Sequence, residues 1–305
     1  MKMKTIPLIL LATALPLCSY AKLNVVATTA EYGAIAREIG GDHVTVTTLG
    51  KPTEDPHFVD AKPSFIMKLN RADVLVEGGA ELEMGWLPPL LEGGRNPKLD
   101  TGKPGRVQCA AGVRLLEVPA TLDRSRGDEH AAGNPHFMTD PVNGKIAAKE
   151  VCDSFCQVDS QSADYYRANL ARFIEKADAK LVEWQKRLAP FHGKRIVTYH
   201  NSWVYFAERF GLRIDLFLEP KPGIPPTPAN LAHVKAVMKE EHIGVIIVEP
   251  YLDRKTAETV AQDTGATVVD VAQFPGGVKG TEGGYIELID YLVNSIAKAF
   301  EQQKP

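Results

Sequence analysis

The chain has few cysteines and no local catalytic or metal-binding motif. Its 305 residues include four cysteines, no CxxC pair and no HExxH segment. A clustered thiolate zinc site and the common metalloprotease site are therefore excluded. The formal net charge is −3, which does not suit a nucleic-acid-binding protein. No short repeat and no low-complexity tract is present.

Long apolar runs are also missing, except at the N-terminus. Lys2 and Lys4 precede an apolar run at 6–17, and small residues follow at Ser19 and Ala21. This order is typical of a secretory signal peptide, and the run is too short for a permanent membrane helix. We therefore expect a signal peptide at 1–21, cleavage after Ala21 and export to the periplasm.

Of the four cysteines, Cys18 lies inside the expected signal peptide. The bulky Leu17 before it disfavours a lipid-anchored N-terminus. An oxidising compartment permits a disulfide among Cys109, Cys152 and Cys156. Because Cys152 and Cys156 are four apart on an expected helix, they are poorly placed to bridge each other. We expect Cys109 to pair with one of them, and the sequence leaves open which one.

Short β-branched runs alternate with helical patterns along the rest of the chain. In the first half we expect strands at 22–28, 43–49 and 73–77 and helices at 31–39, 62–70 and 143–155. In the second half we expect strands at 195–199, 212–218, 245–248 and 267–271 and helices at 203–210, 229–241, 254–264 and 285–300. Such alternation predicts an α/β protein with parallel sheets flanked by helices.

A long helix is predicted between the two halves. Residues 160–188 carry apolar side chains at helical spacing and contain no proline or glycine. A helix of this length would extend about 40 Å. We therefore expect two lobes joined by one long rigid helix: an N-terminal lobe at 22–159, the linking helix at 160–189 and a C-terminal lobe at 190–305. We also expect a monomer.

Three histidines lie where a strand or loop would lead into a helix: His57, His136 and His200. His200 follows the expected strand at 195–199, and Glu249 follows the strand at 245–248. In open α/β sheets the carboxyl ends of the strands border the ligand crevice. Three imidazoles and a carboxylate suit tetrahedral zinc. These four residues are our predicted metal ligands.

The other histidines are interpreted as surface or structural residues. His130 follows Asp128 and Glu129 in an acidic loop. It could hold a metal ion loosely, but solvent exposure explains the loop better.

Four segments resemble the periplasmic zinc- and manganese-binding receptors of ABC importers. They are Pro56-His57 with Pro63-Ser64, Asn134-Pro135-His136-Phe137 with Asp140-Pro141, Tyr199-His200 with Trp203, Tyr205 and Phe206, and the loop 219–228. The resemblance covers nearly the whole mature chain and implies two α/β lobes, a rigid linking helix and a metal ion in the cleft. It implies His57 and His136 as ligands from the first lobe and His200 as a ligand from the second. Relatives with a carboxylate at the third position look suited to Mn²⁺, so His200 favours Zn²⁺.

The sequence departs from the family pattern at the fourth ligand. The usual aspartate after the last strand is replaced by Val271-Ala272-Gln273-Phe274, and Asp270 comes too early. Glu249, Asp270 or water could fill the position. In addition, Met138 replaces an aromatic residue, and the histidine-rich loop of many zinc receptors is reduced to His130.

The resemblance implies a receptor without catalytic chemistry. We expect it to capture zinc and deliver it to an ABC permease in the inner membrane. One alternative is a zinc hydrolase with three histidines and Glu249 as general base. The other is a receptor for a metal chelate, which would need a broad cleft lined by aromatic or arginine side chains.

Overall fold

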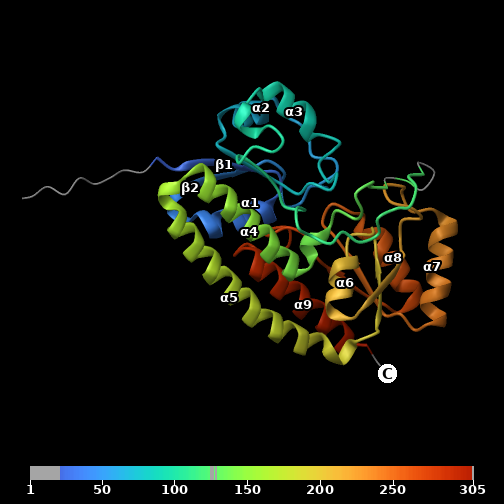
Figure 1. Cartoon of the computed structure of the whole chain (residues 1–305). Coiled ribbons are helices and arrows are strands. Elements are labelled where there is room, and N and C mark those ends of the chain that lie inside the picture. Colours follow the sequence, from blue (N-terminus) through green and yellow to red (C-terminus); the bar gives the residue numbers. More distant parts are fainter. Residues whose placement is uncertain (1–20, 124–126, 128, 304–305) are drawn as a thin grey trace, which may run out of the picture.

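The first half of the chain forms a four-stranded parallel sheet. The structure is a computed structural model that describes residues 21–123, 127 and 129–303 (Figure 1). The predicted signal peptide therefore lies outside the described residues, apart from Ala21. The strand order is β2-β1-β3-β4. The bounds are β1 Leu23–Ala27, β2 Val44–Thr48, β3 Val74–Glu77 and β4 Arg106–Gln108, with helices α1 Ala30–Gly40, α2 Pro63–Arg71, α3 Leu87–Gly94 and α4 Pro141–Val158.

The second half repeats this plan with a second parallel sheet, in the order β6-β5-β7-β8. The bounds are β5 Arg195–Thr198, β6 Arg213–Phe217, β7 Val245–Val248 and β8 Thr267–Asp270, with helices α6 Val204–Phe210, α7 Pro228–Glu240, α8 Arg254–Thr264 and α9 Tyr285–Glu301. The predicted α/β class with two parallel sheets is confirmed.

Alternate residues of each strand enter different cores, as the two-residue period of a strand requires. Val26 and Leu75 pack with α2 and α3 on the outer face of the first sheet. Val25 and Val76, on the opposite face, belong to a core that also holds Ile247 of the second sheet. The inner faces of both sheets thus share one continuous hydrophobic core, so the two halves are packed against each other and not merely tethered.

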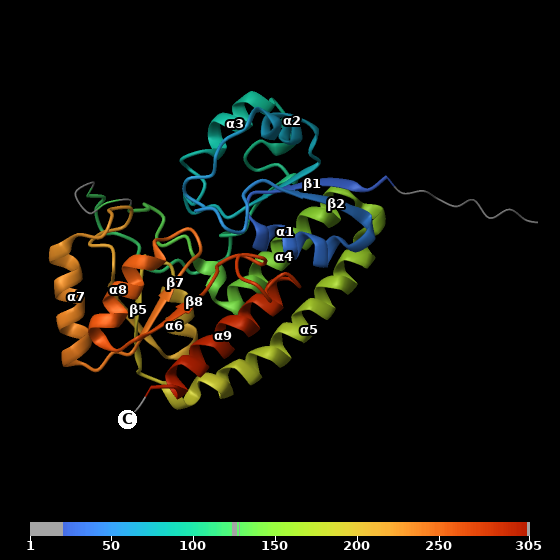
Figure 2. The same cartoon turned by 180° about the vertical axis from the view of Figure 1, so that it is seen from behind.

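The long helix α5 spans Ala163–Leu188, 26 residues. It runs along one side of both halves and lies beside α9 (Figures 1 and 2). Trp184 of α5 is buried and donates its indole N–H to Asp290 of α9 at 3.0 Å. This packing confirms the predicted long, rigid helix. None of the described helices has the length and apolarity that crossing a bilayer would require.

Two expectations for the first half are wrong. No helix or strand is predicted between residues 77 and 143, yet this segment contains α3 and β4. The sequence obscured α3 because Pro88 and Pro89 stand in its first turn and Gly93 and Gly94 end it, while β4 has only three residues. The predicted disulfide is also wrong.

Cys109, Cys152 and Cys156 are all free. Cys109 and Cys152 are packed as buried apolar side chains in the shared core. The Sγ atoms of Cys152 and Cys156 lie 3.9 Å apart on α4, which is a non-bonded distance. Apolar packing in the core therefore explains Cys109 and Cys152 better than cross-linking.

Candidate metal centre

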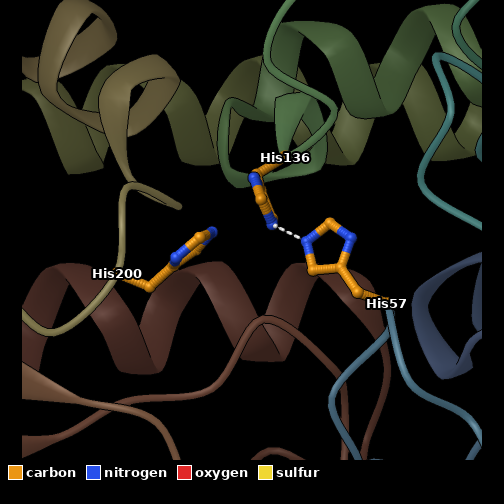
Figure 3. A group of neighbouring side chains, drawn as sticks. All are labelled: His57, His136 and His200. Atoms are coloured by element: carbon orange, nitrogen blue, oxygen red, sulfur yellow. Dashed lines mark hydrogen bonds between the residues drawn. The ribbon is translucent and has the colours of Figure 1, made fainter. Parts of the chain in front are cut away.

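The three predicted histidines lie close together (Figure 3) and border a small cavity lined by residues of both halves of the chain. His57 lies in the loop after β2, His136 lies just before α4, and His200 follows β5. Because all strands are parallel within each sheet, their carboxyl ends open onto one edge, and the following loops carry the functional side chains. The first half contributes two imidazoles and the second half contributes one.

The ligand atoms of these histidines all lie within 4.8 Å of one another. The Nε2 atoms of His57 and His136 are 3.1 Å apart. Two nitrogens on one tetrahedral zinc ion would be separated by about 3.3 Å at the usual bond length. The small cavity beside the rings has a volume of about 30 Å³. Its size and donors suit a single bare ion.

Each imidazole ring is oriented by a hydrogen bond to a neighbouring residue. The Nδ1 atom of His200 lies 2.7 Å from a carboxylate oxygen of Glu219. The Nδ1 atom of His136 lies 3.0 Å from the side-chain oxygen of Asn134, and His57 is hydrogen-bonded to the backbone of Leu82. Such outer partners orient ligating imidazoles and set which nitrogen is free for the metal. The arrangement leaves Nε2 of both His136 and His200 available.

The protonation of the three imidazoles differs. Burial lowers the pKa of His57 to about 3 and lowers that of His136 well below its ordinary value of 6.5. Burial also lowers the pKa of His200, but the hydrogen bond and charge of Glu219 outweigh it and leave that pKa above 6.5. Two rings are therefore neutral and ready to bind a cation, and the third must lose a proton at mildly acidic pH.

The structure does not bring Glu249 into the three-histidine group. Its carboxylate is buried and accepts a hydrogen bond from the indole of Trp203 at 2.8 Å. Burial raises the pKa of Glu249 to about 7. Asp270 is directed elsewhere, since its carboxylate pairs with Arg254 and is half exposed. Ligation by Glu249 stays a prediction, without support from these contacts.

Sequence reasoning missed the roles of Glu219, Asn134 and His130. The ring of His130 stacks on His57 with centroids 5.1 Å apart and borders the small cavity. Glu219 stands in the proline-rich loop and Asn134 in the Asn-Pro-His segment, both of which the sequence had singled out. The sequence alone does not indicate which polar side chain contacts which imidazole ring.

A wider hollow of about 390 Å³ adjoins the histidines. Its wall includes the carboxylates of Glu117, Glu129 and Glu219 and the ammonium of Lys221. Among the described residues of this wall there is no arginine, and Phe217 is its one carbocyclic aromatic side chain. The described wall therefore lacks the arginines that would hold an anionic ligand.

The chain is similar to proteins that are named for the binding and uptake of metal ions. The family model described as ZnuA, zinc-uptake complex component A periplasmic, matches residues 25–299. The chain is 28% identical over 289 residues to the iron-binding protein YfeA of Yersinia pestis, covering 92% of this chain and 87% of that protein. It is 24% identical over 288 residues to the manganese ABC transporter substrate-binding lipoprotein PsaA of Streptococcus anginosus, covering 92% and 90%.

A solved structure gives the same fold. The crystal structure of ZnuA superposes with a TM-score of 0.78 at 23% identity, covering 92% of this chain and 99% of that one. At this identity the likeness establishes the fold, and the names of the relatives differ in the metal they state.

Proposed function

Because the chain belongs to the family of ZnuA, the periplasmic zinc-uptake component, we propose that its cargo is Zn²⁺ held by His57, His136 and His200. The family consists of solute-binding receptors of ABC importers, which bind a divalent metal and work with a membrane permease. They are not enzymes, so the hydrolase alternative is wrong.

The observation that supports zinc is the donor set. Three imidazole nitrogens within 4.8 Å form a nitrogen-rich site. Imidazole suits zinc, whereas Mn²⁺ prefers carboxylate and other oxygen ligands. Relatives are named for iron and for manganese, so we propose zinc on the donor set of this chain. In this account Mn²⁺ binds more weakly at the same site.

We propose water as the fourth ligand. One carboxylate oxygen of Glu249 accepts a hydrogen bond from Trp203, and the carboxylate of Asp270 pairs with Arg254. A zinc ion bound by three histidines commonly completes its tetrahedron with water. The same site argues against the chelate alternative. The cavity beside the rings is about 30 Å³, and the described wall of the wider hollow lacks the arginines that an anionic chelate would need.

We further propose that residues 1–21 direct export, that cleavage follows Ala21 and that the mature chain acts in the periplasm as a monomer. It would consist of the two lobes at 22–159 and 190–305 with the linking helix at 160–189. The inner faces of the lobes share one core, so release at the permease would follow from small rearrangements near His200 and not from wide opening of the lobes.

Elemental analysis tests the proposal. The untagged mature protein, isolated from the periplasm, should retain about one zinc per chain, and His200→Ala should lose it. His233→Ala is the matched control because it removes an exposed imidazole on α7. Retention of manganese in place of zinc, or an unchanged zinc content in His200→Ala, would contradict the proposed cargo and site.

A further inference from the structure

A carboxylate outside the three-histidine group links the two segments that carry the ligands. One oxygen of Glu117 accepts hydrogen bonds from the side-chain amides of Asn134 at 3.0 Å and Asn201 at 2.8 Å. Asn134 stands two residues before His136, and Asn201 directly follows His200. The same atom therefore contacts a segment from the first half and a segment from the second.

The hydrogen bonds of Asn134 determine which nitrogen of His136 is free. The backbone N–H of His136 donates to the Asn134 side-chain oxygen at 3.0 Å. Because a backbone N–H can only donate, that atom is the amide oxygen, and it also faces Nδ1 of the His136 ring at 3.0 Å. An amide oxygen cannot donate, so Nδ1 must carry the hydrogen. Nε2 then keeps its lone pair for the metal.

Glu117 secures the other end of this amide. The NH₂ group of Asn134 donates to Glu117 and to the backbone oxygen of Asn201 at 2.8 Å. The backbone oxygen of Asn134 also accepts from the hydroxyl of Tyr205 at 2.6 Å. Asn134 is buried. Its side-chain hydrogen bonds to Glu117, Asn201 and His136 together fix the orientation of the amide group. Without Glu117, one of its two donors would lack this acceptor.

The backbone of Glu117 indicates that the side chain is kept there at a cost. Its φ is +54°, in the left-handed region that favours glycine and is uncommon for glutamate. The side chain lies in the wall of the wider hollow. Strained residues of this kind are concentrated at functional sites.

We propose that Glu117 is a positioning residue of the metal centre, which holds the His136 and His200 segments at a fixed separation and keeps His136 in its metal-binding tautomer. This inference rests on the proposed function, because it assigns a role to Glu117 in metal binding. Glu117 acts through Asn134 and Asn201 and does not contact the metal.

Two substitutions separate hydrogen bonding from charge. Glu117→Gly removes the side chain at a backbone position that glycine adopts without strain, so the variant should fold. Glu117→Gln removes the charge but keeps a carbonyl oxygen that can accept both bonds. Glu129→Ala is the matched control: it deletes a carboxylate from the same wall, and one bond of that carboxylate is accepted from the backbone N–H of Asp123.

The first readout is zinc release from the loaded protein into excess chelator, followed by stopped flow. Changes in outer partners of metal ligands typically weaken affinity by about 10–100-fold. Glu117 reaches the ligand segments only through Asn134 and Asn201, and it is solvent-exposed. We therefore expect about tenfold faster release from Glu117→Gly, at the low end of that range. Glu117→Gln and Glu129→Ala should release zinc at the wild-type rate.

The second readout is the ¹⁵N NMR signature of the His136 ring in metal-free protein. Wild type and Glu117→Gln should show hydrogen on Nδ1, and Glu117→Gly should show a mixture of tautomers. Wild-type release and a wild-type tautomer in Glu117→Gly would overturn the inference, as would a Gln variant as impaired as the Gly variant. If the wild-type protein binds no zinc, the proposed function fails, and the tautomer measurement still decides the role of Glu117.

Discussion

Glu219→Gln should weaken zinc binding and change its dependence on pH. The carboxylate of Glu219 lies 2.7 Å from Nδ1 of His200, and the two side chains are only 12% and 16% exposed. The substitution keeps a hydrogen-bond acceptor of nearly the same shape. It therefore removes mainly the negative charge that raises the electron density of the bound imidazole and offsets the charge of the ion.

Two independent estimates give the size of the effect. A hydrogen bond to a charged group contributes about 1.5–3 kcal/mol. Loss of an outer partner of a metal ligand weakens affinity by about 10–100-fold, which corresponds to roughly 1.4–2.8 kcal/mol. We therefore expect the dissociation constant for zinc at pH 8 to rise by about 10–100-fold.

The pH profile distinguishes this mechanism from a general loss of structure. Zinc must displace any proton on Nε2 of His200, and the pKa of His200 lies above 6.5 because of Glu219. Wild-type affinity should thus fall by about tenfold per pH unit once the pH drops below that pKa. In Glu219→Gln burial dominates and lowers the pKa of His200, so the fall should begin at lower pH. The two affinity curves should converge as the pH decreases.

Chelator-competition titrations between pH 5.5 and 8.5 measure both curves. Glu129→Gln is the control, since it neutralises another carboxylate of the same hollow. Equal affinities at pH 8, or parallel curves over the whole range, would refute the assigned role of Glu219.

Three further predictions concern the ligands, the contact between the halves and the buried carboxylates. His57→Ala should reduce zinc affinity by more than the roughly 100-fold that outer partners can contribute, measured by the same competition, and a smaller loss would contradict ligation by His57. Arg209→Ala breaks two 2.8 Å bonds to Asp140 and should lower the free energy of unfolding by about 2 kcal/mol; urea denaturation that gives an unchanged value would contradict this. Burial raises the pKa of Glu83 to about 7 and that of Glu31 to about 8, from an ordinary value of 4.5. The neutral forms of these two carboxyl groups therefore contribute to folding stability below pH 4.5, and this contribution is lost as the pH rises through 7–8. Metal-free protein should therefore unfold more easily in urea at pH 9 than at pH 5, and Glu31→Gln should reduce this difference; stability that increases with pH would be the contrary result.

The sequence predicted elements well wherever local signals and packing agree. Strand β7 and helix α8 begin and end where expected, because Val245–Val248 is a continuous β-branched run and α8 is bounded by an Asp253 N-cap and by Gly265 at a φ of +74°. Helix α3 was missed because its prolines and glycines indicate a loop. Its stability comes instead from packing Leu87 and Leu90 against the outer face of the first sheet, which no local pattern reveals.

The convergence of the three histidines was predictable from the sequence, whereas the residues that contact them were not. His200 follows β5, His136 lies shortly before α4 and His57 lies in the loop after β2. Their convergence agrees with the parallel topology, which brings the loops after the strands to one edge of each sheet. The same rule placed Glu249 at the crevice, but it could not show that the side chain of Trp203 bonds its carboxylate. His130 looked like a residue of a solvated loop, yet its ring stacks on His57. Contacts of this kind depend on side-chain depth and loop path, which spacing in the chain does not determine.

The most direct test of the central claim is a competition between zinc and manganese for the metal-free mature protein at pH 7.5. We predict one site per chain, occupied by zinc even when manganese is in large excess, and no tight site when His57, His136 and His200 are all replaced by alanine. Preferential binding of manganese, or tight zinc binding that survives the triple substitution, would contradict the assignment of these histidines as a zinc site.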